Sequence, residues 1–429
     1  MKPSRPLAGA LSCALATFVA GAFACAPAAA APPLAGPVPV NEASAVRMEG
    51  MFRAGMQALK AGDMETAIRA FREMLSVEPG LVRVRLELGR ALFTAKQYSD
   101  ASDEFTLALS GKLPDEARQY VLQYLRAIEA RSGFTWDFSV GLGLAPELFR
   151  AYQSDTLSLN FLGAPLEFTL KREDEDARLA ISVTGSAEYR KEVGTIGEDT
   201  KVVAYVYAGA DGTTRDVNPQ DLRTLSLTAR SGARIAFDRS TLNVYGNAQL
   251  GFRNNDQYED VYTLNAYHLH RFEDGLSVNF GGGVGYAERH GQNSRSGAVA
   301  NLAGNVVRTI DGRAYYGASA QATRRFADFS DASYTQVRLA GLGGYEFEGG
   351  YSMSGEVFAL HYVEDGPLVP FSEVRQETEL GINLKFKKND LYFAGFTPYV
   401  TTGFSHRMSS ISAYAYDEGR FQVGIERAF

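Results

Sequence analysis

Cysteine, histidine and tryptophan are scarce in this chain of 429 residues. Its two cysteines, Cys13 and Cys25, both stand near the N-terminus, so we expect neither a disulfide framework nor thiol chemistry in the rest of the chain. Two of the five histidines, His268 and His270, lie two positions apart without a third metal-ligating residue nearby. We therefore predict no metal site and interpret these histidines as a polar pair at a membrane interface.

Long apolar runs are also missing beyond the N-terminus, where none reaches the roughly 20 residues that a membrane helix needs. Any membrane crossing must then be made by strands. Catalytic motifs are missing as well: no Gly-x-Ser-x-Gly motif joins a strand to a helix, and the glycine-rich segment 281–285 lacks the Lys-Ser/Thr of a phosphate loop. We predict a protein that is not an enzyme and has no cofactor. A net charge of −7 argues against nucleic acid as a partner.

The N-terminus has the features of an export signal. Lys2 and Arg5 precede an apolar stretch from about Leu7 to Ala24, and small residues allow cleavage after Ala24 or Ala30. Lipidation at Cys25 remains a less favoured alternative, because the residues before it match a lipoprotein signal poorly. We assign residues 1–30 to the signal and residues 31–42, rich in proline and alanine, to an extended linker.

Residues 43–132 have the apolar spacing of amphipathic helices, and one pattern occurs twice at an offset of 34 residues. Small residues where helices would cross, with an aromatic residue four positions later, are typical of tetratricopeptide repeats. The usual tryptophan is missing, which leaves an unrelated helix bundle as the alternative. Two repeats and a final helix are few for a free solenoid, so we expect this domain to dock on the part of the chain that follows. The residues expected to pack the repeats are Gly55, Ala67, Phe71, Pro79, Gly89, Tyr98, Ala101, Phe105 and Ala108.

A second regular pattern fills residues 134–429. Very short polar turns alternate with longer and more variable segments, and the unit of turn, strand, long loop and strand recurs roughly every 36 to 40 residues. Apolar and polar residues alternate with the period of a strand in segments such as 241–252 and 377–387. Short turns at one end, long loops at the other and strands of about ten residues or more indicate a bacterial outer-membrane β-barrel.

The count of strands comes to about 14 when the pattern is extended toward the N-terminus. The first four strands are expected at 135–145, 166–172, 179–191 and 222–237. The segments between them are expected to be a long loop at 146–164, a charged turn at 173–177 and a long loop at about 192–221. An even number of strands places the first and the last residue of the barrel on the same side of the membrane. This side must be the periplasm, because the helical domain precedes the barrel. The predicted fold is a short α-helical repeat domain followed by an antiparallel transmembrane β-barrel of about 14 strands.

The last eight residues resemble the C-terminal signal that the barrel-assembly machinery reads. Gln422, Gly424 and Phe429 match the pattern of this signal, whereas Arg427 stands where an apolar residue is usual. We therefore expect the barrel-assembly machinery and outer-membrane lipid to be partners of this chain.

The layout of signal, short repeats and barrel ending in phenylalanine resembles that of the surface lipoprotein assembly modifier family. The segments Trp136-Asp-Phe-Ser-Val-Gly-Leu-Gly-Leu-Ala-Pro-Glu147 and 154–170 are similar to the opening of that family's barrel. Two features depart from the family. After Pro146 this chain has Glu147-Leu-Phe-Arg150 where many relatives have an Asp-x-Asn-x-Asn run, and its helical domain is small.

The resemblance implies a translocon in the outer membrane. Its cargo would be a lipoprotein, or a related small secreted protein that binds haem or metal, moved from the periplasm to the cell surface. The barrel would be the conduit and the repeats would recruit the cargo, which agrees with the tendency of repeat concavities to bind extended segments. The alternative is an outer-membrane channel or receptor for a solute such as a polysaccharide, haem or an iron chelate.

Overall fold

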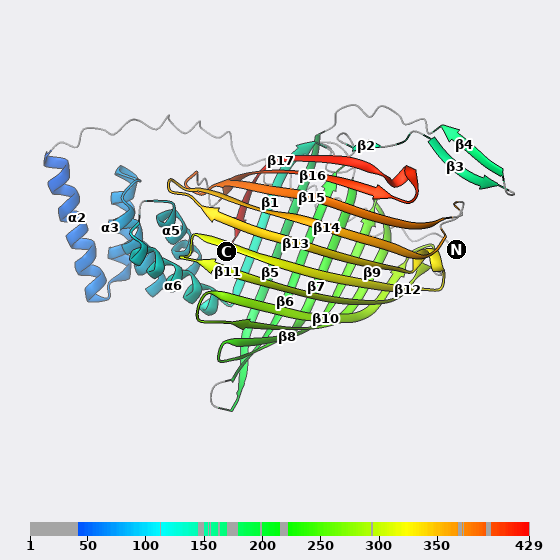
Figure 1. The fold of residues 1–429 in the computed structure, drawn as a ribbon. Coiled ribbons are helices and arrows are strands. Elements are labelled where there is room, and N and C mark those ends of the chain that lie inside the picture. Colours follow the sequence, from blue (N-terminus) through cyan, green and yellow to red (C-terminus); the bar gives the residue numbers. More distant parts are fainter. Residues whose placement is uncertain are drawn as a thin grey trace, which may run out of the picture.

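The computed structural model describes residues 42–428 except 112, 145–149, 153, 155, 162–163, 170–178, 198–199, 215–221, 293–294, 368–370, 372 and 392–395. The expected signal at 1–30, nearly all of the linker at 31–42, the charged turn at 173–177 and Phe429 lie outside the described residues. Within them, a group of helices stands at one end of a closed cylinder of strands (Figure 1). We call the two ends of the cylinder the helical end and the far end.

The helices pack in sequence as antiparallel neighbours, and residues at several of their ends stop or cap them. Gly62 has a φ of +82° just after the first helix, and the Asp63 side chain caps the next helix by accepting a hydrogen bond from the Thr66 amide at 3.1 Å. Pro114 stands at the N-cap of the last helix. No helix in the described part of the chain is both long and apolar enough to cross a membrane. The helices are α2 (Glu42–Ala61), α3 (Met64–Val77), α4 (Val82–Thr94), α5 (Tyr98–Ser110) and α6 (Asp115–Arg131).

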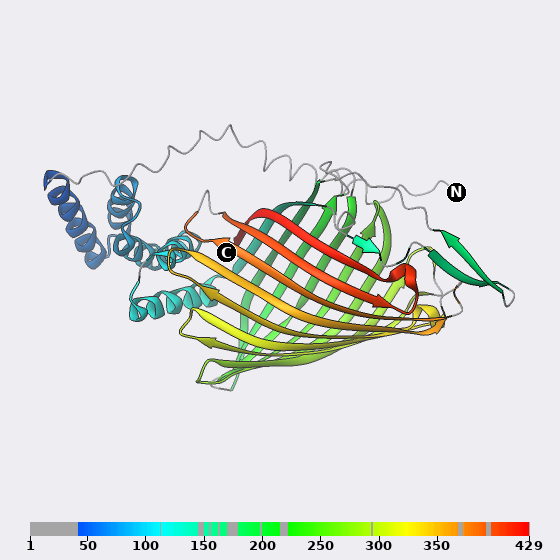
Figure 2. The same cartoon turned by 45° about the horizontal axis from the view of Figure 1, so that its top comes forward.

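Fourteen antiparallel strands among the described residues close the cylinder, which confirms the predicted fold class. Each strand pairs with the next along the chain, and β1 pairs with both β5 and β17 to complete the ring (Figure 2). The strands are β1 (Phe134–Leu144), β5 (Leu179–Ile196), β6 (Thr200–Thr214), β7 (Leu222–Phe237), β8 (Ser240–Arg253), β9 (Asp256–Arg271), β10 (Leu276–Arg289), β11 (Gly297–Ile310), β12 (Ala314–Ala327), β13 (Tyr334–Glu346), β14 (Tyr351–Pro367), β15 (Val374–Lys388), β16 (Thr397–Ser409) and β17 (Tyr416–Ala428).

The prediction of a barrel strand at 166–172 is wrong. Its described part belongs to β4 (Ala164–Thr169), which pairs with β3 (Thr156–Phe161) in a separate two-stranded sheet. The chain leaves the cylinder at Leu144 and re-enters at Leu179, directly opposite. Six residues are too few to span the apolar layer, which needs about 9 to 11 in a tilted strand. The expected loop at 146–164 also contains β3 and β2 (Arg150–Tyr152), which pairs with β17.

The prediction of a long loop at about 192–221 is also wrong, because this segment contains the barrel strand β6. The second half of β6, with Gly209, Asp211 and Gly212, has the composition of a loop. Gly209 is accommodated there because the Tyr207 side chain of the same strand fills the space beside it, where an added Cβ would lie 2.6 Å from the tyrosine hydroxyl. This missed strand compensates for the wrongly assigned one, so the predicted count of 14 agrees with the structure.

The barrel has an apolar outer face and a polar inner face, as the alternation predicts. Leu302 and Val284 are more than 60 % exposed on the outside. Tyr316 and Phe326 are exposed near the two ends of β12. These two aromatic residues are ten positions apart. At about 3.4 Å per residue in a strand tilted by about 40°, they are separated by about 26 Å along the barrel axis, which matches the height of the apolar band of a membrane barrel.

Candidate functional site

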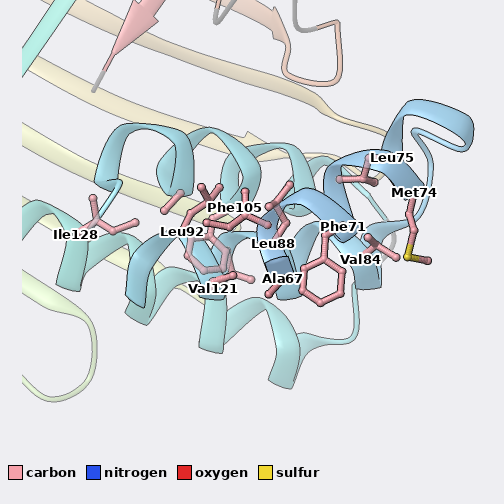
Figure 3. Close-up of a cluster of buried hydrophobic side chains, with 13 residues drawn as sticks. Ala67, Phe71, Met74, Leu75, Val84, Leu88, Leu92, Phe105, Val121 and Ile128 are labelled. Carbon is pink, nitrogen blue, oxygen red and sulfur yellow. The ribbon is translucent and has the colours of Figure 1, made fainter. Parts of the chain in front are cut away.

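Each helical repeat is closed by an aromatic ring that packs against a glycine of the preceding helix. The two rings, Phe71 and Phe105, belong to the buried core of the helical domain (Figure 3). A Cβ added at Gly55 would lie 2.6 Å from the ring of Phe71, and one added at Gly89 would lie 2.8 Å from the ring of Phe105. Both rings are buried, as are the alanines that precede each of them by four positions, Ala67 and Ala101. The two repeats therefore use the same contact 34 residues apart.

The other expected packing residues lie around this core. Ala108 is buried in α5, and the Tyr98 ring lies 5.8 Å from that of Phe93. The Pro79 carbonyl accepts two hydrogen bonds from Arg85, at 3.1 and 2.9 Å, in the link between α3 and α4. The helix α6 covers the open side of the second repeat, where Tyr124 stacks on Phe105 with ring centroids 5.0 Å apart.

Residues of α5 and α6 contact the helical end of the barrel, which confirms the expected docking. Arg118 of α6 forms an ion pair with Glu346 at the end of β13. Leu122 of α6 packs over Gly312 in the turn between β11 and β12, where φ is +65° and any Cβ would collide with the leucine. Asp103 of α5 accepts a hydrogen bond of 3.3 Å from Arg427 of β17.

A groove of about 800 Å³ lies beside this junction, between the helical domain and the outer wall of the barrel. The end of α6 and the start of β1 form its floor. The lining carries three cations and three aromatic rings, from Arg72, Lys96, Arg131, Tyr98, Phe134 and Tyr189. One of the cations, Arg72, is paired with Asp100 at 2.7 Å, so the groove has a positive balance. Such a surface suits an acidic or amphipathic partner.

One wall of the lumen, formed by β6 to β9, is aromatic and basic. The rings of Tyr245 and Tyr267 are stacked with centroids 6.3 Å apart, and Tyr205 lies 6.4 Å from Tyr245. The guanidinium of Arg230 lies 5.9 Å from the centre of the Tyr245 ring, and that of Arg234 lies 4.6 Å from the Tyr205 ring. Arginine and tyrosine present both polar and apolar surface, so this wall can contact varied polymers.

The opposite wall carries a chain of alternating acidic and basic residues across β14 to β17. Arg375 lies 2.6 Å from Glu377 and 3.6 Å from Glu364. The chain continues through Arg407, which lies 2.5 Å from Glu379 and 3.5 Å from Glu377. The sequence does not reveal this network, because each residue stands at an ordinary polar position of a strand and only the register of neighbouring strands brings them together. The network is completed by Arg420 and Glu418.

Gln422 and Gly424, two of the three expected C-terminal residues, lie on the last strand, where the cylinder closes. Gln422 points into the lumen, and its amide donates a hydrogen bond to the Tyr399 hydroxyl at 3.0 Å and another to Ser182 of β5. Gly424 faces Gly141 of β1 across the seam. Arg427 lies with its guanidinium 5.1 Å from the centre of the Trp136 ring, which accounts for a cation at this position.

The two histidines singled out in the sequence lie on the outer face of β9 near the helical end. His268 lies between Phe237 and Phe280, with ring centroids 6.1 and 5.4 Å away. His270 shares a hydrogen bond of 2.8 Å with the Ser240 hydroxyl. In the part of the chain that the structure covers, no group of three or more histidine, cysteine, aspartate or glutamate residues could hold a metal ion.

Comparison with known proteins gives matches in both domains. A family model for the N-terminal repeats of the surface lipoprotein assembly modifier matches residues 48–105, and a second model, for the surface lipoprotein assembly modifier itself, matches residues 219–429. The chain is 39 % identical over 92 residues to the surface lipoprotein assembly modifier of Moraxella catarrhalis, which is 21 % of this chain and 18 % of that protein. It is 27 % identical over 111 residues to surface lipoprotein assembly modifier 1 of Neisseria meningitidis serogroup B, which is 26 % of this chain and 22 % of that protein.

The chain thus spans about a fifth of the length of the curated relatives that it matches. Among solved structures, the outer membrane channel DcaP of Acinetobacter baumannii superposes with a TM-score of 0.38 and 10 % identity, over 70 % of this chain and 98 % of that one.

Proposed function

Because the chain belongs to the surface lipoprotein assembly modifier family and is an outer-membrane β-barrel protein, we propose that it is a translocon for cargo proteins. Its cargo is a surface lipoprotein or a related small secreted protein that binds haem or metal. The helical domain collects the cargo in the periplasm, and the barrel passes it to the cell surface. The observation that carries this proposal is a repeat domain docked on the mouth of a cylinder with a polar lumen.

The orientation in the membrane follows from the lengths of the connections. At the helical end, β7 and β8 are separated only by Asp238 and Arg239, and β11 and β12 only by 311–313. At the far end, 34 residues separate Leu144 from Leu179. Membrane barrels have short turns in the periplasm and long loops outside. The helical domain therefore faces the periplasm, where a newly exported cargo is found.

The groove beside the junction is the surface to which we assign cargo recruitment. It is formed by both domains, and its cations and rings can hold an extended or amphipathic segment next to the barrel mouth. A cylinder of 14 strands is wide enough to keep an open lumen rather than a packed core. Tyrosine and arginine on one wall and paired charges on the other favour contacts with a passing polypeptide over contacts with lipid.

The test is surface exposure of the cargo. Deletion of the gene should leave the cargo inside an intact outer membrane, where an impermeant protease cannot reach it, and the wild-type gene should restore exposure. The double variant Lys96→Glu/Arg131→Glu should reduce exposure severalfold, because it reverses two cations of the groove. Lys201→Glu, in β6 and not among the residues that line the groove, is the control for a charge reversal elsewhere and should deliver normally. Unchanged exposure of every surface lipoprotein in the deletion strain would reject the proposal.

A second candidate function, a channel for a polysaccharide or another solute, is favoured by the stacked Tyr245 and Tyr267 in the lumen. Aromatic rings in a pore offer stacking surface to sugars as well as to peptides. The two functions differ in their response to Tyr245→Ala. A solute channel loses solute-dependent block of its conductance in planar bilayers, whereas a translocon shows no such block in either form.

A further inference from the structure

Among the described residues, the seam between β1 and β17 is the shortest in the cylinder, and beyond it β17 pairs with the short strand β2 at Tyr416, Asp417 and Glu418. Seven residue pairs join these strands, from Asp137 opposite Ala428 to Gly143 opposite Gln422. β1 forms eleven pairs with its other neighbour, β5, and the remaining neighbouring strands share between 11 and 14. Hydrogen bonds between strands hold a barrel edge closed in lipid, and fewer residue pairs hold this seam than any other pair of neighbouring strands in the described cylinder.

The middle of the seam lacks a pair of facing side chains, because Gly141 stands opposite Gly424. Side-chain pairs across strands contribute much of the stability of a sheet, so their loss weakens the seam further. The space over Gly141 is filled by the side chain of Gln422, with which any Cβ at that position would collide. Gln422 reaches Ser182 on β5 and Tyr399 on β16, so on the lumen side one amide bridges the seam.

The foot of the seam is in contact with the helical domain. Arg427 of β17 lies over Trp136 of β1 and also reaches Asp103 of α5. One side chain thus touches both strands of the seam and the domain to which we assign cargo recruitment. A movement of α5 when cargo binds would act directly on the strand that closes the barrel.

The two faces of the seam are chemically opposite. Leu142, Phe421, Val423 and Ile425 point outward and are exposed where acyl chains surround the barrel. On the inside, Gly143, Ser182 and Gln422 line a cavity of about 710 Å³ in the lumen. An opened seam would therefore connect a polar interior directly with hydrocarbon.

Building on the proposed function, we propose that β1 and β17 separate during transport and that the opened seam is the exit for the acyl chains of a lipidated cargo. The polypeptide stays in the polar lumen, while its acyl chains pass between the strands and remain in an apolar environment. This route avoids exposing a lipid anchor to water, which is unfavourable in proportion to its length. A cargo without acyl chains does not need the seam to open.

The test locks the seam with the disulfide variant Val140→Cys/Ile425→Cys. These residues are paired, and facing Cα atoms in an antiparallel ladder are about 4.5–5.5 Å apart, which suits a disulfide. The matched control, Ala320→Cys/Leu339→Cys, places the same bond between β12 and β13. Each full-length variant is expressed with a lipidated cargo and with the same cargo lacking its lipidated cysteine, and surface exposure is measured with and without a reductant.

We expect the locked seam to reduce delivery of the lipidated cargo at least tenfold, to leave the unlipidated cargo unaffected, and to recover with reductant. The control disulfide should deliver both cargoes. Normal delivery of the lipidated cargo by a fully oxidised seam variant would overturn the inference and leave the translocon function intact, and so would equal loss of both cargoes. No delivery by the wild-type chain would instead remove the proposed function. If the variant does not assemble, Leu142→Cys/Val423→Cys locks the same seam at another pair.

Discussion

Arg118 of α6 and Glu346 of β13 form an ion pair that joins positions 228 residues apart in the sequence. The Arg118 side chain is only 6 % exposed, whereas that of Glu346 is 43 % exposed at the rim of the barrel. The Arg118 side chain is thus buried against the helical domain, while its guanidinium reaches the barrel. With Leu122 over Gly312, this pair fixes α6 against the barrel mouth.

Substitution of Arg118 by alanine should loosen the helical domain from the barrel. We expect a loss of about 1 kcal/mol in docking free energy, because one partner remains in contact with solvent. Hydrogen exchange of the α6 amides in the full-length protein measures this. A double-mutant cycle with Glu346→Ala should give a coupling energy of similar size, and additive effects of the two substitutions would contradict a direct interaction.

The glycines of α2 and α4 should respond oppositely to the same substitution. Gly89→Ala places a Cβ against the buried ring of Phe105, so we expect a net loss of about 1 kcal/mol after the gain in helix propensity. Gly50→Ala meets nothing within 4 Å and should stabilise the helical domain by about 1 kcal/mol. Thermal unfolding of the helices, followed by circular dichroism in detergent, checks both. A stabilising Gly89→Ala would show that the contact between glycine and ring is loose.

The helical domain should lose stability in acid through Asp63. The hydrogen bond from the Thr66 amide lowers the pKa of this carboxyl below its ordinary value of 3.8. A lowered folded-state pKa means that the stabilisation is present above pH 3.8 and is lost as the pH falls through the folded value. Asp63→Asn keeps a capping side chain without a titratable group. Its helical unfolding temperature should fall less between pH 5 and pH 2, and an identical pH dependence would contradict this role.

Charge on the outer face of the barrel should be costly, and charge on the inner face should not. Leu302→Arg places a cation where the side chain meets lipid, and we expect a loss of about 2–4 kcal/mol near the middle of the membrane. Asn305→Arg, three positions along the same strand on the lumen side, should cost little. Urea unfolding in lipid vesicles measures both, and equal costs for the two variants would be incompatible with the assigned faces.

The barrel and most of its strands could be predicted because alternation is a local property of the sequence, whereas the count of 14 agreed because two errors compensated. A residue such as Val284 is apolar because it faces lipid, and its neighbour Gly283 is small because the Asn265 side chain fills the space beside it. The helical repeats could also be predicted, because Gly55 and Gly89 each contact an aromatic ring of the next helix and therefore recur at a fixed spacing. The strand β6 was missed because its small inward residues resemble a loop. The role of Arg427 depends on a contact with another domain, which no local pattern contains.

The most direct test of the account asks whether cargo passes through the lumen. Val244 and Tyr245 are adjacent on β8, and the first faces lipid while the second faces the lumen. A photo-crosslinking amino acid at each position is illuminated while cargo is being delivered. We predict a crosslink to cargo from position 245 and none from position 244. Delivery of the cargo without a crosslink from position 245, or with equal crosslinks from both, would contradict passage through the barrel.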